Sequence, residues 1–352
     1  MDRYIGVDVH SKSCTLAVMS GAGRRLKEQV IDTNAKVLIE TVRSIGGTLH
    51  LCFEEGTLSN WIYELLEPHV DKLVVVQPRK RAHGSKSDAI DAWTLAENIR
   101  TGKLETQVFK KPQRFNRLRQ AVRAQQIAVK DVTRAKNRLN SLYRSRGINN
   151  TTEAIYDLEQ REAWLRKLPS AHRMLGEMLS RQLDGLIEAY ERAEQWLHNE
   201  AAQVPEVKQL MTVDGFGPIR AAQVVAVVLV PERFRTKRQF WSYCGLGIVT
   251  RSSSDWVRDS STGKWKRTDV AQTRGLNRNC SRMLKNVFKG AAESVIRMRA
   301  HPLSEDYSRM LENGIKPNLA TLTIARRIAA AVLAIWKHKE VYTREKHRPK
   351  AA

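Results

Sequence analysis

Residues 4–18 read YIGVDVHSKSCTLAV. The side chains alternate along residues 4–9 and again along 14–18, the period-2 pattern of strands with one buried face. The polar run His10-Ser11-Lys12-Ser13 breaks this alternation. We therefore predict two strands joined by a tight hairpin, with Asp8 at the end of the first.

Strands and helices alternate in the residues that follow. The sequence predicts a strand over 27–31, a helix over 35–45, a buried strand over 48–53 that ends on Glu54, a helix over 60–66, a buried strand over 73–76 and a helix over 87–99. Three strands followed by alternating helices and strands indicate an α/β layer with a mixed sheet. We assign this domain to residues 1–104.

The rest of the chain is predicted to be mainly helical. Residues 105–204 are rich in strong helix formers, so we expect a pair of long helices, one basic and one acidic, that associate as a hairpin or coiled coil. A third part, residues 205–352, is predicted to contain helices over 221–230, 237–244, 276–298 and 319–338, with a polar loop over 250–263. Gly215 and Gly217 flank Phe216 before a helix, as in a helix-hairpin-helix element that can hold a phosphate.

The charge of the chain points to a polyanionic partner. Lys and Arg number 60 against 37 Asp and Glu, a formal charge of +23 in 352 residues. No uninterrupted apolar run reaches the roughly 18 residues of a membrane span, and the N-terminal residues have a strand pattern instead of that of an export signal. The four cysteines are scattered and include no CxxC pair. These features favour a nucleic-acid-binding protein of the cytoplasm and exclude a zinc ribbon or a disulfide framework.

Four acidic residues occupy positions from which they can converge. Asp8 and Glu54 end two strands, while Asp88 and Asp91 lie three residues apart on the first turn of a helix. Carboxylates gathered in this way repel each other unless a cation neutralises them. Oxygen ligands with no His or Cys partner favour Mg²⁺ or Mn²⁺, and two such ions about 3.5–4 Å apart clamp a phosphodiester for displacement.

Each acid also has an ordinary structural explanation. Asp8 suits a turn at a strand end, Glu54 a solvent-exposed position, and Asp88 an N-cap. Glu55 is a rival for Glu54, but it would point to the opposite face of a continuing strand. All four spacings together, in a basic chain, favour a ribonuclease-H-like metal site over four separate roles.

Several short motifs resemble one family. The pieces Gly6-Val7-Asp8, Cys52-Phe53-Glu54-Glu55-Gly56 and Lys86-Ser87-Asp88-Ala89-Ile90-Asp91-Ala92 resemble the DEDD domain of the insertion-sequence one-hundred-and-ten family of transposases. The pieces Val213-Asp214-Gly215-Phe216-Gly217-Pro218 and Phe240-Trp241-Ser242-Tyr243-Cys244-Gly245-Leu246, with the serines that follow, are similar to that family's second domain. The resemblance extends over essentially the whole chain, in the same order.

This resemblance implies a ribonuclease-H-like (RuvC-like) first domain and a serine that attacks DNA to form a covalent phosphoserine link. The candidates are Ser252, Ser253 and Ser254, and counting without a gap from Gly245-Leu246 selects Ser253. The chain has Ser254-Asp255 where the family usually has Ser-Gly, so Ser252 and Ser254 remain alternative candidates for the nucleophile. The resemblance also implies a structured bridge RNA that pairs with double-stranded target and donor DNA. It further implies a homo-oligomer, a dimer assembling to a tetramer, associated with the nucleoid of a bacterium or archaeon.

Two basic clusters are predicted to neutralise nucleic-acid backbone. The predicted contacts are Arg114, Arg117, Arg123, Arg134, Lys136 and Arg138 in the linker, Gly215 and Gly217 in the hairpin, and Arg235, Arg238, Arg251, Lys264, Lys266 and Arg267 around the serine loop. For the linker cluster, a solvated helix face is the alternative. Trp256 and Trp265 can stack on bases, whereas core packing is an equal alternative for Trp241.

Three functions fit these features. The first is a bridge-RNA-guided serine transposase. The second is a metal-dependent, structure-selective nuclease of the Holliday-junction resolvase type, in which water attacks and the serines are inert. The third is a non-catalytic nucleic-acid scaffold that retains only the fold. The product of a reaction with DNA distinguishes the three: the transposase gives DNA bound to protein, the nuclease gives freely cleaved DNA, and the scaffold leaves the DNA intact.

Overall fold

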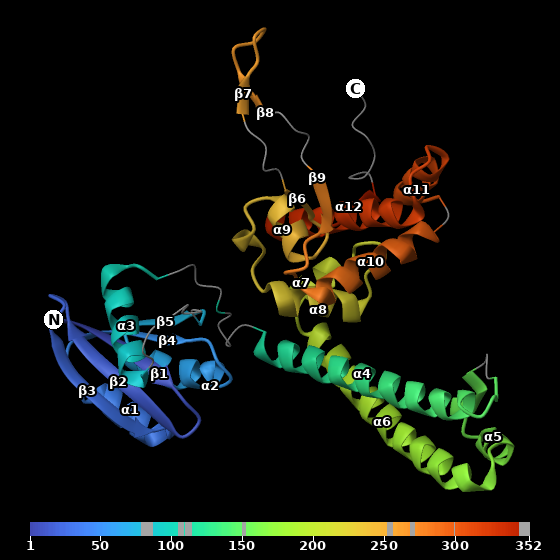
Figure 1. Cartoon of the computed structure of the whole chain (residues 1–352), viewed down its shortest axis with the longest axis horizontal. Coiled ribbons are helices and arrows are strands. Elements are labelled where there is room, and N and C mark those ends of the chain that lie inside the picture. Colours follow the sequence, from blue (N-terminus) through green and yellow to red (C-terminus); the bar gives the residue numbers. More distant parts are fainter. Residues whose placement is uncertain are drawn as a thin grey trace. The chain divides into compact units, whose positions relative to one another are not determined.

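The computed structural model describes residues 1–78, 87–104, 109, 115–149, 153–251, 256–267, 272–298 and 300–344. The chain forms two compact units, Met1–Asn116 and Arg117–Ala352, with the elements labelled in Figure 1. The three-part division at residues 104 and 204 stays a prediction.

The first unit is built on a five-stranded mixed sheet. Its elements are β1 (Asp2–Val9), β2 (Ser13–Ser20), β3 (Arg25–Asp32), α1 (Ala35–Arg43), β4 (Thr48–Glu54), α2 (Ser59–Leu66), the 3₁₀ turn η1 (Glu67–His69), β5 (Lys72–Val76) and α3 (Asp88–Thr101). The strand order is β3-β2-β1-β4-β5. The first three strands are antiparallel neighbours, while β4 runs parallel to β1 and to β5. The predicted α/β domain is therefore confirmed, and its sheet is compatible with a ribonuclease-H-like fold.

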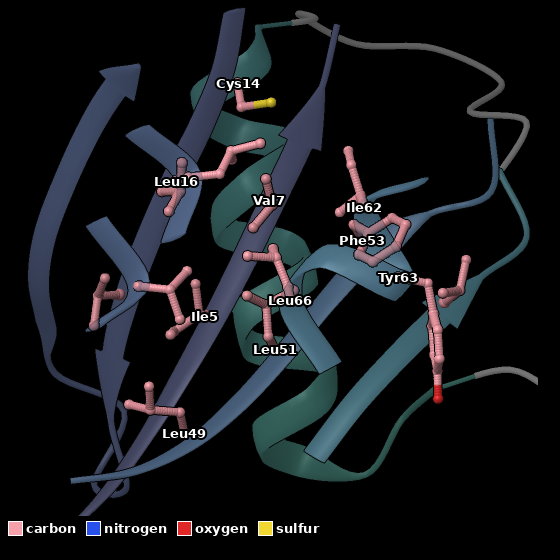
Figure 2. Close-up of a cluster of buried hydrophobic side chains, with 14 residues drawn as sticks. Ile5, Val7, Cys14, Leu16, Leu49, Leu51, Phe53, Ile62, Tyr63 and Leu66 are labelled. Atoms are coloured by element: carbon pink, nitrogen blue, oxygen red, sulfur yellow. The ribbon is translucent and has the colours of Figure 1, made fainter. Parts of the chain in front are cut away.

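Alternation along β1 and β4 separates two faces of this sheet. Ile5, Val7, Leu51 and Phe53 belong to a core cluster that also includes residues of α1 and α2, and Figure 2 shows these side chains packed together. The opposite face packs on α3 through two smaller clusters. The sheet is therefore covered on one face by α1 and α2 and on the other by α3.

Gly6 allows α3 to lie directly against β1. A Cβ atom at this position would be 1.9 Å from the Ala92 carbonyl oxygen and 2.5 Å from the Ala96 nitrogen. These atoms belong to the helix backbone and cannot move as a flexible side chain would. The helix therefore approaches the strand more closely here than any residue with a side chain would permit.

We expect Gly6→Ala to destabilise the first unit by about 3 kcal/mol, because the added methyl group forces α3 away from β1. The measurement is the midpoint of thermal unfolding, followed by circular dichroism. Gly21→Ala is the matched control, because a Cβ atom there meets no heavy atom within 4 Å. Equal midpoints for the two variants would show that the helix does not depend on this close contact.

The second unit begins with two long helices. Its first elements are α4 (Asn116–Arg144), the 3₁₀ turn η2 (Glu153–Tyr156), α5 (Arg161–Lys167) and α6 (Ser170–Ala202). Leu139 and Tyr143 of α4 share a core cluster with Leu183 of α6, Leu165 of α5 and Ile155 of η2. The predicted pair of long helices is confirmed. A coiled-coil seam along their full length stays a prediction.

The remainder of the second unit is mainly helical, as predicted. It contains α7 (Pro205–Leu210), α8 (Pro218–Val228), the 3₁₀ turn η3 (Pro231–Arg233), α9 (Lys237–Tyr243), β6 (Ile248–Arg251), β7 (Trp256–Arg258), β8 (Trp265–Arg267), β9 (Gln272–Leu276), α10 (Arg282–Ile296), α11 (Pro302–Glu312) and α12 (Pro317–His338). The expectation of a polar loop over 250–263 was wrong in part, because β6 and β7 enter this range. Short strands with exposed side chains lack the buried alternation that would have revealed them. The helix expected over 276–298 was wrong at its start, because Leu276 ends β9 and α10 begins at Arg282.

Helix α12 is the central helix of this part. By length and composition it is apolar enough to cross a membrane, but 61% of its most apolar window is buried inside the protein. Ile324, Ile328, Val332 and Ile335 recur at helical spacing and are all buried. This is the pattern of a core helix.

Candidate metal centre

Asp8 is positioned by the same alternation that places Gly6 against α3. The two residues are two apart on β1, so the Asp8 side chain leaves the strand on the face where Gly6 contacts α3. The Asp8 side chain is 18% exposed. The carboxylate therefore lies at the end of a central strand, partly sheltered from water.

Glu54 occupies the corresponding end of the next strand. β4 pairs with β1 in parallel register, Phe53 opposite Val7, so the two strands end side by side. Cys52 packs with Leu95 of α3, which places Glu54, two residues on, on that same face. Glu54 is half-buried and Glu55 exposed. The role of Glu54 as a metal ligand stays a prediction.

Asp88 and Asp91 extend the sheet-facing stripe of α3. Asp88 precedes Ala92 by one helical turn, and Ala92 contacts Gly6 on β1. Asp91 precedes Leu95 by one turn, and Leu95 packs with Cys52 on β4. The two acids therefore continue the rows of α3 residues that lie over β1 and β4.

The N-cap of α3 is Ser87, whose side chain accepts a hydrogen bond from the Ile90 backbone N–H. Asp88 therefore lies inside the first turn and does not cap the helix, which removes the structural role suggested for it by sequence. A favourable interaction with the helix dipole is available to both acids in this turn. It does not account for their alignment with the strand ends.

His10 joins the cluster, and the sequence reasoning missed it. Its Nε2 atom lies 3.1 Å from an Asp8 oxygen and 3.4 Å from an Asp88 oxygen. In the described part of the chain, Asp8, His10 and Asp88 offer ligand atoms that all lie within 4.8 Å of one another. The predicted acidic set therefore has a histidine beside it, and the identity of the metal ligands stays a prediction. The available signal was the spacing, since His10 follows Asp8 by two residues.

The electrostatics of Asp8 reflect its burial and, to a smaller extent, the negative charge near it. Burial raises the pKa of this carboxyl, the interaction with His10 opposes that rise, and the nearby charges of Asp88 and Asp91 add to it. A carboxylate whose pKa is raised by two like charges is stabilised in its ionised form when a cation binds between them. The donor set of two carboxylates and an imidazole fits a divalent ion such as Mn²⁺, or Mg²⁺ with water completing the shell.

The serine loop is bounded by strands. Ser252, Ser253 and Ser254 lie outside the described residues. β6 ends on Arg251 just before them and pairs antiparallel with β9, while β7 starts at Trp256 just after them. The assignment of Ser253 as the nucleophile stays a prediction.

In the glycine hairpin before α8, the fold itself explains why one of the two positions is glycine. Gly215 has φ +81°, and a Cβ atom there would lie 2.7 Å from the Ala291 carbonyl oxygen of α10. Gly217 is exposed and is the N-cap of α8. Phosphate binding at these two residues stays a prediction, as does the helix-hairpin-helix element.

A second polar cluster, also missed by sequence reasoning, surrounds Asp214. The fully buried His301 accepts a hydrogen bond from the Leu303 backbone N–H at Nδ1, so its Nε2–H donates to Asp214 at 3.1 Å. Arg344 donates to both carboxylate oxygens, at 2.9 and 3.1 Å. The Arg344 hydrogen bonds, assisted by those from His301, lower the pKa of Asp214. This cluster joins the start of α11 and the residues after α12 to the loop before α8.

Because the pKa of Asp214 is lower in the folded state, the stabilisation it provides is complete above its ordinary pKa of 3.8. It is lost as the pH falls through the lower, folded-state pKa. We expect Asp214→Asn to lower the stability of the second unit by about 1–3 kcal/mol at pH 7. The difference from the parent should narrow below pH 4, measured as the midpoint of urea unfolding. An equal difference at both pH values would contradict a role for the ionised carboxylate.

The predicted nucleic-acid contacts differ in exposure and in pairing. Arg123, Arg134 and Arg138 share one exposed face of α4 with Lys130, at helical spacing. Arg117 pairs with buried Glu200, Lys136 with Glu153 and Arg134 with Asp131, so these three also have partners within the protein. Exposed residues of the C-terminal cluster are Arg235, Arg238, Lys264 and Lys266. Arg114 and the side chains of Arg251 and Arg267 lie outside the described part of the chain.

Comparison with known families agrees with these features. Residues 5–145 match the family model of the DEDD domain of IS110 transposases, whose description is "Transposase". This range includes all four predicted acidic ligands. Residues 207–308 match a second model, described as Transposase IS116/IS110/IS902 family, and this range includes the serine loop. A comparison with curated proteins finds no match. The two family matches occur in the order expected from the short motifs, and the chain belongs to the IS116/IS110/IS902 family of transposases.

Proposed function

We propose that this transposase cleaves and rejoins DNA through a covalent phosphoserine link. In this proposal Ser253 is the nucleophile, and Asp8, Glu54, Asp88 and Asp91 bind Mg²⁺, with Mn²⁺ as a substitute. The observation that carries it is the convergence of Asp8, His10 and Asp88 at the end of β1. The serine triplet in the second family region supports the nucleophile.

The proposed reaction exchanges one phosphate ester for another. The Ser253 hydroxyl oxygen would attack a backbone phosphorus and form a bond to it while the bond from phosphorus to one deoxyribose oxygen breaks. The proton of the serine hydroxyl would pass to water, and the departing deoxyribose oxygen would take up a proton from water and leave as a hydroxyl group. Because an ester bond is retained, the reverse attack by a DNA hydroxyl rejoins a strand and restores the serine. A divalent ion in the acidic cluster would stabilise charge on the phosphoryl oxygens.

The proposed partners are nucleic acids and further copies of the chain. A bridge RNA that pairs with target and donor DNA would select sequence, while the protein contacts backbone and shape. The charge of +23 supports such a polyanionic assembly. Exchange between two duplexes needs several active sites, which supports a dimer that assembles to a tetramer. The setting would be the nucleoid in the cytoplasm of a bacterium or archaeon.

The exposed basic face of α4 provides a test of backbone binding. We expect Arg123→Gln and Arg138→Gln each to reduce the slope of log affinity against log salt by about 0.9, because each removes one phosphate contact. The measurement is fluorescence anisotropy with labelled duplex DNA at several salt concentrations. Lys36→Gln, on α1, is the control for the loss of one exposed charge, its side chain being 81% exposed. If the slope of log affinity against log salt is the same in all three variants and in the parent, the basic face of α4 is a solvated helix face that does not contact DNA.

A metal-dependent nuclease of the Holliday-junction resolvase type is the alternative. The cluster of Asp8, His10 and Asp88 lies entirely within the first unit. Water could therefore be the nucleophile there without any contribution from the serine loop. A non-catalytic scaffold with the same fold is the third function.

A denaturing gel separates these functions. The purified protein is incubated with end-labelled DNA, Mg²⁺ and the RNA that copurifies with it. A labelled band that migrates with the protein, and that shifts to the mobility of free DNA after protease treatment, supports the phosphoserine link. Cleaved DNA without attached protein supports the nuclease, and intact DNA under these conditions supports the scaffold. Sequencing the copurified RNA tests the guide separately.

A further inference from the structure

The hairpin of β7 and β8 has a defined pairing and a hydrogen-bonded turn. Trp256 pairs with Arg267, Val257 with Lys266 and Arg258 with Trp265 in antiparallel register. Asp259 fixes the turn by accepting hydrogen bonds from the Ser261 backbone N–H and hydroxyl and from the Thr262 N–H. Gly263 has the positive φ, +65°, that closes the turn. The two strands are therefore held in one register by their own connection.

Two tryptophans share one face of this hairpin. Trp256 and Arg258 are two residues apart on β7, and Arg258 lies opposite Trp265, so all three side chains leave the same face. Trp256 is 55% exposed and Trp265 66%. Trp241 differs, because its indole N–H donates to the Arg326 carbonyl at 2.9 Å within the helical part. Large aromatic surface left in water on a short ribbon indicates a binding face.

The charge of the hairpin selects the class of partner. Arg258, Lys264 and Lys266 are exposed, and the one carboxylate among residues 256–267, Asp259, is held by the turn. The pKa of Asp259 is lowered by its hydrogen bonds from Ser261 and Thr262. Cationic side chains beside exposed aromatic rings are suited to bind a nucleic-acid strand, which presents phosphates next to the faces of its bases.

We propose that Trp256 and Trp265 stack on unpaired DNA bases beside the cleavage point. Base faces are covered by their neighbours in a duplex and become accessible where the strands separate. A tryptophan ring stacks on any base, but its single N–H donor cannot read the edge pattern in a groove. Unpaired DNA is therefore a better match than duplex DNA. The location beside the cleavage point rests on the proposed function, because Trp256 follows Ser253 by three residues.

The test measures binding of the full-length protein to fluorescein-labelled single-stranded DNA and to the same sequence as a duplex. We expect Trp265→Ala to weaken single-strand binding by about 5- to 150-fold, with a larger loss in the double variant Trp256→Ala/Trp265→Ala. Trp265→Phe should retain most of the affinity, because the ring can still stack. Duplex binding, which depends on other basic residues, should change little. A 2-aminopurine base in the single strand should report stacking with the parent and not with the double variant.

Val257→Ala is the matched control. Val257 is 53% exposed and points to the opposite face of the same hairpin. Unchanged single-strand affinity in the double tryptophan variant would overturn the proposal. It would also be overturned by an equal loss in Val257→Ala, which would indicate a disordered hairpin, or by an equal loss for duplex DNA. These readouts require no DNA cleavage, so their failure is distinguishable from the absence of a protein-linked band, which would refute the proposed function.

Discussion

Asp8→Asn should lower the rate of DNA cleavage by on the order of 10²- to 10³-fold, because it removes one of the proposed negative ligands at the end of β1. Asparagine keeps the size of the side chain and one oxygen but cannot supply the charge that attracts a divalent ion. Binding of the DNA backbone should persist, since it depends on basic residues elsewhere. The measurement is the single-turnover cleavage rate at saturating protein, with DNA affinity measured in parallel.

Asp32→Asn is the matched control for this change. Asp32 ends β3 in the same sheet and is exposed, outside the group formed by Asp8, His10 and Asp88. This variant should cleave DNA at the parent rate. A cleavage rate in Asp8→Asn equal to that of Asp32→Asn would remove the acidic cluster from the chemistry. Partial recovery of Asp8→Asn at higher Mn²⁺ concentration would agree with weakened metal binding.

Ser253→Ala should abolish the protein-linked DNA band, with the rate falling by on the order of 10⁶-fold, as for other enzymes that lose their nucleophile. The side chain loses the oxygen that would form the bond to phosphorus, and nothing else in the acidic cluster replaces it. Binding of Mg²⁺ and DNA should be unchanged. The readout is the denaturing gel with labelled DNA, with and without protease.

Ser252→Ala and Ser254→Ala are the controls for register. Both should retain the protein-linked band if Ser253 is the nucleophile. Loss of the band in one of these controls alone would move the nucleophile by one residue and leave the reaction as proposed. Freely cleaved DNA at the parent rate in all three variants would contradict serine chemistry and support the nuclease.

The sheet of the first unit was predictable because two periodicities dominate its sequence. Alternation in β1 and β2 and short apolar runs in β4 and β5 predicted the strands to within one or two residues. The helix now assigned as α3 was predicted from Ile90, Trp93 and Leu95. The same patterns place Asp8 and Glu54 at strand ends. Side-chain periodicity is therefore sufficient to place these two acids at strand ends, whereas the pairing of β1 with β4 comes from the structure.

Contacts between distant residues were not predictable in the same way. His10 lies in the turn after β1, where no periodicity constrains the direction of a side chain. Its approach to Asp88 depends on how closely α3 packs on β1, and that distance is set by the missing side chain of Gly6. The link from Asp214 to His301 joins residues 87 positions apart, and no local pattern reports such a pair.

The β7–β8 hairpin was missed for a different reason. Its strands are three residues long and exposed, so they bury no apolar face that sequence periodicity could detect. Asp259 and Gly263 carry a turn signal, but the surrounding serines made the whole stretch resemble a loop. The sequence alone shows that Trp256 and Trp265 lie in a basic segment. Only the structure shows that the pairing of β7 with β8 places both side chains on one face.

The central claim is that carboxylates from β1, β4 and α3 hold a divalent ion. The most direct measurement is anomalous diffraction from crystals of the protein soaked in Mn²⁺, recorded near the manganese absorption edge. We predict a peak within bonding distance of the Asp8 and Asp88 carboxylates, and no peak there in crystals of Asp8→Asn. A well-diffracting crystal of the parent with Mn²⁺ bound only elsewhere would contradict it.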